Sequence, residues 1–159
     1  MIIRGIVDED FVNYKMPSMF VIFPYCSFKC EKECGMKVCQ NSSLARERII
    51  AITASELVDR YMSNQITHAL TVGGLEPLDS LDDLKDLITA FRKKCNDTIV
   101  VYTGYNKDEV SAICPWLFDI KNLIIKFGRF VPSEPHHKDE LLGVELASPN
   151  QYAEAFNVY

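Results

Sequence analysis

Long apolar runs are missing from this chain of 159 residues, and no stretch approaches the roughly 18–20 apolar residues that a membrane-spanning helix needs. The chain also lacks a long basic run, and its formal net charge is −5, so no surface for DNA or RNA is expected. The opening residues, MIIRGIVDED, show neither the cationic nor the apolar segment of an export signal. These absences predict a cytoplasmic protein that binds neither membranes nor nucleic acid.

Four of the six cysteines stand in one short loop, residues 26–39, at Cys26, Cys30, Cys34 and Cys39. A disulfide framework is not expected in a reducing compartment. Clustered thiolates suit a soft metal or an iron–sulfur cluster. Structural zinc remains an alternative, although zinc modules usually draw their cysteines as two short-spaced pairs from two hairpins. The crowding of all four into one loop favours the iron–sulfur cluster.

The pattern of apolar residues predicts an α/β fold with a mostly parallel sheet. The composition, 48% hydrophobic and 25% charged, fits one domain over residues 1–159. Helices are expected after Thr53, which forms a capping-box sequence with Glu56, after Ser80, which is expected to cap the helix that follows it, and over Lys107–Cys114. The tail from about Val131 is expected to be irregular and to pack over one end of the sheet. Buried strands are expected at Ser18–Tyr25, Thr67–Val72, Thr98–Tyr102 and Asn122–Phe127.

Chemistry-bearing residues follow each of the four expected strands. The cysteine loop follows the first, Gly73–Pro77 the second, Thr103–Tyr105 the third and Lys126–Arg129 the fourth. Because ligands of parallel sheets bind at the carboxyl ends of the strands, these segments are expected to converge on one face. Thiolates, an open glycine backbone, a carboxylate and two cations would then meet there. That combination suits a zwitterionic ligand beside a metal cluster.

These residues resemble the radical S-adenosylmethionine superfamily, and within it the activating protein of the anaerobic, glycyl-radical ribonucleotide reductase. The resemblance runs over nearly the whole chain in co-linear order. It is carried by the segments DFVNY, the cysteine loop ending in CQN, GGLEPL, VVYTGY, LIIKFGRF and SPNQ. It implies a small partial (β/α) barrel of the radical S-adenosylmethionine type.

The resemblance also implies a reaction and its partners. Three cysteines hold a 4Fe–4S cluster, and the amino and carboxylate groups of S-adenosylmethionine chelate its open iron. Reductive cleavage gives methionine and a 5′-deoxyadenosyl radical, which takes the α-hydrogen of a glycine in the large reductase subunit. An electron donor such as flavodoxin or ferredoxin is required.

The resemblance places the cluster ligands at Cys26, Cys30 and Cys39. The family spacing is CxxxCxxC, and this chain departs from it because its last cysteines lie farther apart. Val38 and the CQN segment match the family residues around the last ligand, where an apolar side chain packs on adenine. Cys34 is left as a bystander thiol or a ligand in the resting state.

The resemblance further assigns ligand-binding roles to Gly73, Gly74, Glu76, Thr103 and Arg129. Leu75 is inserted into what is normally Gly-Gly-Glu-Pro, a departure that could bulge the turn. Glycines allow the backbone to approach the methionyl ammonium closely, and the guanidinium can bind the methionyl carboxylate bidentately.

Two other functions stay open at this point. One is activation of a different glycyl-radical enzyme. The other is a small iron–sulfur electron carrier or structural metal protein that does not bind S-adenosylmethionine. The GGLEP segment favours an enzyme, because a simple carrier does not need it.

Overall fold

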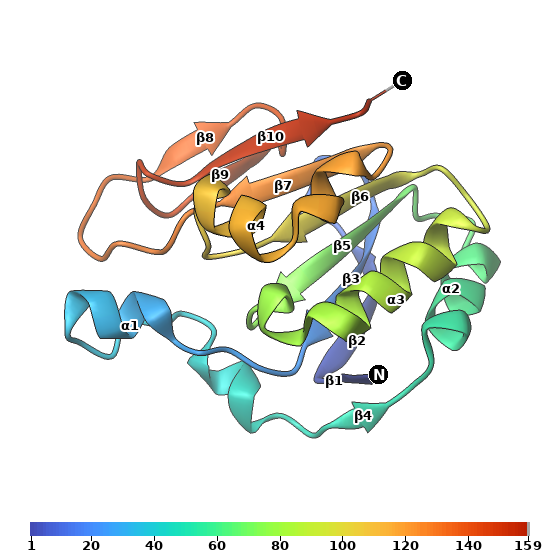
Figure 1. Cartoon of the computed structure of the whole chain (residues 1–159), viewed down its shortest axis with the longest axis horizontal. Helices are drawn as coiled ribbons and strands as arrows, with labels where there is room; N and C mark the ends of the chain where they lie inside the picture. Colours follow the sequence, from blue (N-terminus) through green and yellow to red (C-terminus); the bar gives the residue numbers. More distant parts are fainter. Residues whose placement is uncertain (159) are drawn as a thin grey trace.

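A six-stranded sheet of order β10-β7-β6-β5-β3-β2 forms the centre of the computed structural model, which describes residues 1–158 (Figure 1). The central strands β3, β5, β6 and β7 are parallel, and the edge strands β2 and β10 are antiparallel to their neighbours. The predicted α/β fold with a mostly parallel sheet is therefore confirmed, while the narrower prediction of a partial radical S-adenosylmethionine barrel stays a prediction. The strands are β2 (Gly5–Asp10), β3 (Ser18–Phe23), β5 (Ala69–Gly74), β6 (Thr98–Tyr102), β7 (Leu123–Phe127) and β10 (Tyr152–Phe156).

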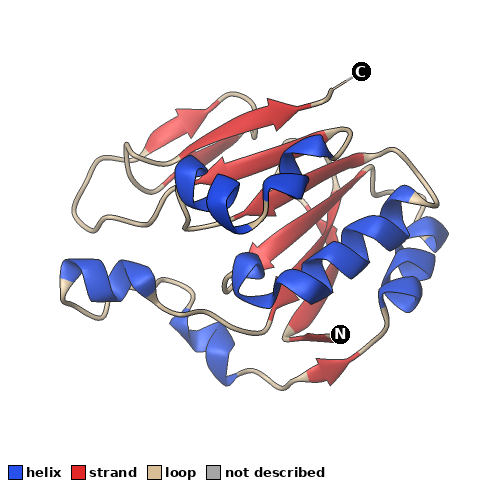
Figure 2. Ribbon diagram, in the orientation of Figure 1, coloured by secondary structure: helices blue, strands red, loops and turns tan. Residues whose placement is uncertain are grey.

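Helices α2, α3 and α4 cover one face of this sheet, whereas α1 belongs to the cysteine loop and stands apart from them (Figures 1 and 2). The helices are α1 (Lys29–Cys34), α2 (Ala54–Ser63), α3 (Leu81–Arg92) and α4 (Lys107–Ile113). Short 3-10 helices occupy η1 (Ser42–Arg46), η2 (Pro77–Ser80) and η3 (Pro115–Asp119). None of the helices within residues 1–158 has the length and apolar character needed to cross a membrane.

The capping predictions had different outcomes. Thr53 and Glu56 form the predicted capping box at the start of α2. Ser80 precedes α3, but its side chain makes no capping hydrogen bond, so that prediction is wrong. The preceding η2 turn leads directly into α3 and leaves the Ser80 hydroxyl buried without a partner.

The sheet is buried on both faces. The helix-covered face carries the larger core, with Phe23, Leu84, Phe91 and Phe127 among its side chains. A smaller core lies on the opposite face, where Leu142 and Leu146 from the tail pack with Val100 and Ile124 of the sheet. Alternate residues of β6 and β7 point into the two cores.

The tail from about Val131 is not irregular, which corrects the sequence-based expectation. Two short strands, β8 (His137–Asp139) and β9 (Val144–Leu146), pair with each other, and β10 pairs along the whole of β7. No residue of β10 is buried, so its apolar pattern is weak. Backbone hydrogen bonds to the free edge of β7 hold this strand, and such pairing leaves little signal in the sequence. A further two-stranded sheet joins β1 (Ile2–Ile3) to β4 (Ile50–Ala51).

Candidate functional site

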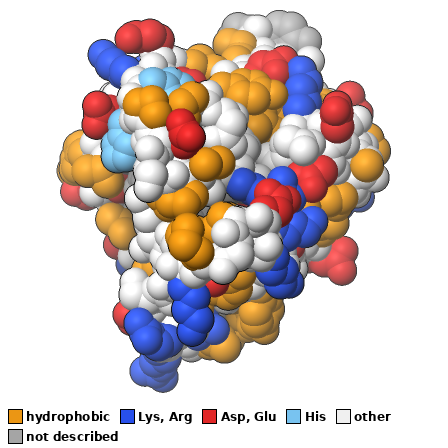
Figure 3. Space-filling model, turned by 90° about the vertical axis from the view of Figure 1, so that its left-hand side faces the viewer, with side chains coloured by type: hydrophobic (Ala, Val, Ile, Leu, Met, Phe, Trp, Pro, Cys, Tyr) orange, Lys and Arg blue, Asp and Glu red, His pale blue; other side chains and the backbone are white. Residues whose placement is uncertain are grey.

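A cavity of about 500 Å³ lies at the carboxyl ends of the parallel strands. That volume falls in the range of sites for small-molecule ligands. Figure 3 shows the side toward which these strand ends point, where basic and acidic side chains adjoin near the centre of the view. The predicted site residues that line the cavity are Cys26, Cys30, Cys39, Gly74, Glu76, Thr103 and Arg129, whereas Gly73 and Val38 are not part of its lining.

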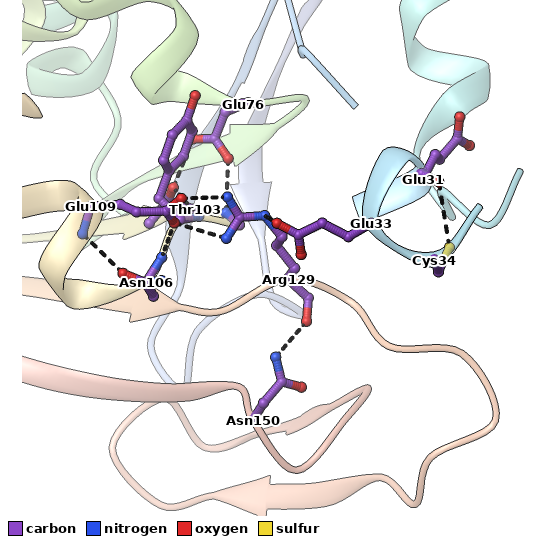
Figure 4. Close-up of polar contacts among 11 residues, drawn as sticks. Glu31, Glu33, Cys34, Glu76, Thr103, Asn106, Glu109, Arg129 and Asn150 are labelled. Carbon is purple, nitrogen blue, oxygen red and sulfur yellow. Dashed lines mark hydrogen bonds and ion pairs between the residues drawn. The ribbon is translucent and has the colours of Figure 1, made fainter. Parts of the chain in front are cut away.

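Three of the four loop cysteines line this cavity, and the fourth does not. Cys26 follows β3, and its sulfur accepts a hydrogen bond of 3.2 Å from the Phe28 backbone N–H. The backbone N–H of Cys39 donates to the Glu31 carboxylate at 3.1 Å, which folds the end of the loop back onto α1. The Cys34 sulfur lies 3.7 Å from the Glu31 carbonyl oxygen, on the side of α1 away from Glu76 and Arg129 (Figure 4).

The donor chemistry of the loop fits a 4Fe–4S cluster. Within residues 1–158, no three His, Cys, Asp or Glu side chains are close enough to hold a single metal ion. In a cluster each thiolate binds a different iron, so thiols spread around one cavity suit a cluster better than a lone zinc ion. Burial raises the pKa of Cys26 to about 12 and also raises that of Cys30. Because the ligands must be thiolates, binding would release protons.

Glu76 acts as a clamp between two turns. It is only 6% exposed, and its carboxylate accepts hydrogen bonds from the Thr103 hydroxyl at 2.8 Å, the Gly104 N–H at 2.8 Å and the Leu78 N–H at 3.0 Å. Burial raises the pKa of Glu76 to about 7, while these hydrogen bonds oppose the shift. Since Glu76 is occupied by protein donors, we assign Glu76 and Thr103 to positioning the turns after β5 and β6.

Packing within the sheet leaves little space for a side chain at either glycine of the GGLEP segment. A Cβ on Gly74, whose φ is +88°, would lie 2.5 Å from Cγ2 of Ile22 on the neighbouring strand. A Cβ on Gly73 would lie 3.0 Å from Cβ of Tyr102. Contacts within the sheet therefore explain both glycines without a ligand, and the expected approach of a methionyl ammonium stays a prediction.

Arg129 is already paired with carboxylates (Figure 4). Its two terminal nitrogens bind Glu109 at 2.8 and 2.7 Å, in the bidentate arrangement that guanidinium groups favour. Its Nε lies 3.1 Å from Glu33 of α1, an ion pair without the alignment of a hydrogen bond. The neighbouring guanidinium lowers the pKa of Glu109 to about 2. In this arrangement Arg129 joins α4 to α1, so a ligand carboxylate would have to displace these partners.

Two further residues of the site were given no role from the sequence, and one of them, Asp79, was not singled out at all. Asp79 of η2 accepts hydrogen bonds from the Tyr105 hydroxyl at 2.6 Å and from the Ser27 N–H at 2.5 Å, which anchors the start of the cysteine loop. Lys126 of β7 lines the cavity, and burial lowers its pKa to about 8. The sequence placed Lys126 in the segment after the fourth strand without giving it a role, and the position of a lysine within the apolar run LIIKF is the signal that could have given it one.

Comparison with known proteins identifies the family. A family model described as a 4Fe-4S single cluster domain matches residues 18–147. The chain therefore belongs to the 4Fe-4S single cluster domain family, which is associated with radical S-adenosylmethionine activases. Neither the curated proteins nor the solved structures gave a match. Family membership indicates a 4Fe–4S cluster as the cofactor, and the choice of Cys26, Cys30 and Cys39 as its ligands stays a prediction.

Proposed function

We propose that this protein is a radical S-adenosylmethionine activase that generates a glycyl radical on the large subunit of anaerobic ribonucleotide reductase. One observation carries the proposal: three loop cysteines and the turns after β5, β6 and β7 line the same cavity of about 500 Å³. An electron carrier needs its thiolates but has no use for an adjoining cavity of small-molecule size. The co-linear resemblance to the reductase activating proteins supplies the choice of partner.

In this proposal Cys26, Cys30 and Cys39 hold the cluster and leave one iron for the ligand. When bound, the cluster would supply the one-electron reduction, with an electron from flavodoxin or ferredoxin, that splits a C–S bond of S-adenosylmethionine to methionine and a 5′-deoxyadenosyl radical. The chain itself orients the ligand and limits access of water. Glu76 and Thr103 fix the two turns, and Phe20 and Tyr102 give the cavity an apolar wall.

Anaerobic reconstitution with iron and sulfide tests the proposal. We expect the reduced protein to show a cluster signal in electron paramagnetic resonance that changes when S-adenosylmethionine is added. We also expect 5′-deoxyadenosine and methionine as products, which a Cys39→Ser variant treated in parallel does not form.

The partner is tested in the same system. Mixed with the large reductase subunit from the same source, the protein is expected to produce an organic radical signal. The doublet of that signal collapses when the glycine carries deuterium at its α-carbon. A fully assembled, reducible cluster in a protein that neither binds nor cleaves S-adenosylmethionine would favour the electron-carrier function instead.

A further inference from the structure

Three cations line the cavity, and their surroundings differ. Arg129 is held between Glu109 and Glu33. The Lys29 nitrogen lies 4.0 Å from the centre of the Tyr105 ring, a cation–π contact. Lys126 is only 7% exposed, and within residues 1–158 it makes neither an ion pair nor a contact with an aromatic face.

The Lys126 ammonium has unused hydrogen-bonding capacity. It donates to the Gly128 carbonyl oxygen at 2.9 Å, its one hydrogen bond among the described residues. That carbonyl also accepts from the Gln151 side chain at 3.2 Å, so it is fixed by the tail. An ammonium has three donors, and burying it is costly unless they are satisfied. The remaining donors are available to a group bound in the cavity.

The need to balance the charge of the Glu76 carboxylate does not explain why the Lys126 ammonium is buried here. The two groups influence each other electrostatically, but they form no ion pair. The Glu76 oxygens are filled by the Leu78, Thr103 and Gly104 donors, so the carboxylate has little need of an ammonium. If the only role of Lys126 were to balance the charge of Glu76, its ammonium would be expected to contact that carboxylate.

We propose that Lys126 binds the carboxylate of the ligand held in this cavity. The identity of the ligand rests on the proposed function, because S-adenosylmethionine carries a single anionic group, its methionyl carboxylate. Lys126 then takes the role that the family resemblance implies for Arg129, whose guanidinium is occupied by two glutamates.

Binding of S-adenosylmethionine and of its decarboxylated analogue, measured by anaerobic equilibrium dialysis on the reconstituted protein, tests this assignment. The variants are Lys126→Met and, as a matched control from the same cavity, Lys29→Met. Circular dichroism and iron content check that each variant is folded and loaded. A charge-assisted hydrogen bond of ordinary strength predicts that Lys126→Met weakens binding of S-adenosylmethionine about ten- to a hundredfold. Binding of the decarboxylated analogue is expected to stay within about twofold of wild type.

The possible results separate this inference from the proposed function. If Lys126→Met weakens the binding of both compounds equally, or of neither, the role of Lys126 is overturned while the proposed function still stands. The same holds if Lys29→Met, rather than Lys126→Met, removes the preference for the carboxylate. A reconstituted wild-type protein that binds neither compound overturns both.

Discussion

The two walls of the cavity are held in different ways. The turns after β5 and β6 are joined by the buried Glu76, which accepts three hydrogen bonds from within the protein. The opposite wall is the cysteine loop, whose helix α1 has no buried residue. Contacts that hold the loop to the body of the protein are made by the Ser27 backbone N–H and by the side chains of Lys29 and Glu33. One wall is formed by the fold itself, and the other is expected to depend on its cofactor for order.

The largest effect is expected from removing a cluster ligand, because the cysteine loop is the wall that is expected to depend on the cluster. Serine at Cys26, Cys30 or Cys39 should abolish the reconstituted cluster, because an alcohol is a poor ligand for a soft metal. Iron and sulfide analysis with absorption spectra gives the measurement. Cys34→Ser is the matched control and should keep a full complement of iron, since its sulfur faces backbone carbonyls. Retention of the cluster in Cys39→Ser and its loss from Cys34→Ser would reverse the assignment.

Glycine substitutions on the two walls give the next largest difference. Gly74→Val is expected to destabilise the fold by about 3 kcal/mol or more, because the new Cβ overlaps Ile22 at a positive φ. Gly35→Ala in the cysteine loop also has a positive φ, but its Cβ would meet nothing within 4 Å, so about 1 kcal/mol is expected. Urea unfolding measures both. Equal losses would mean that the loop is packed as tightly as the sheet.

The sequence predicted the sheet better than it predicted the site. The central strands carry buried apolar runs, which are visible without any tertiary information, whereas β10 is defined by its partner β7. For the site, the sequence could place residues at strand ends but not their hydrogen-bond partners. Glu76 was predicted as a ligand-binding residue, yet its partners Thr103 and Gly104 lie far along the chain. Arg129 likewise forms ion pairs with Glu109 and Glu33, which lie far from it in the sequence and could not be identified as its partners.

The Glu76 clamp makes stability depend on pH. The pKa of Glu76 in the folded protein, about 7, lies above the ordinary value of 4.5 for a glutamate, because burial favours the protonated carboxyl. Stability from this group is fully present below pH 4.5 and is lost as pH rises through about 7. We expect the difference in unfolding free energy between wild type and Glu76→Gln to fall by about 2–3 kcal/mol from pH 5 to 7.5. A constant difference would mean that the three hydrogen bonds outweigh burial and keep the carboxylate ionised throughout.

Breaking the Arg129–Glu33 contact is expected to have the smallest effect on global stability and to act on the loop alone. Glu33 is 62% exposed, and Arg129 keeps both hydrogen bonds to Glu109, so Glu33→Gln should change the unfolding free energy by less than about 1 kcal/mol. Hydrogen exchange followed by mass spectrometry should nevertheless show faster exchange over α1 and unchanged exchange over β5 and β6. Glu109→Gln serves as the comparison. It removes the bidentate partner of Arg129 and is expected to lower the free energy of unfolding more than Glu33→Gln does. Unchanged exchange over α1 in Glu33→Gln would show that the loop does not depend on this contact for its order, and the contrast between the two walls would be weaker than the contacts indicate.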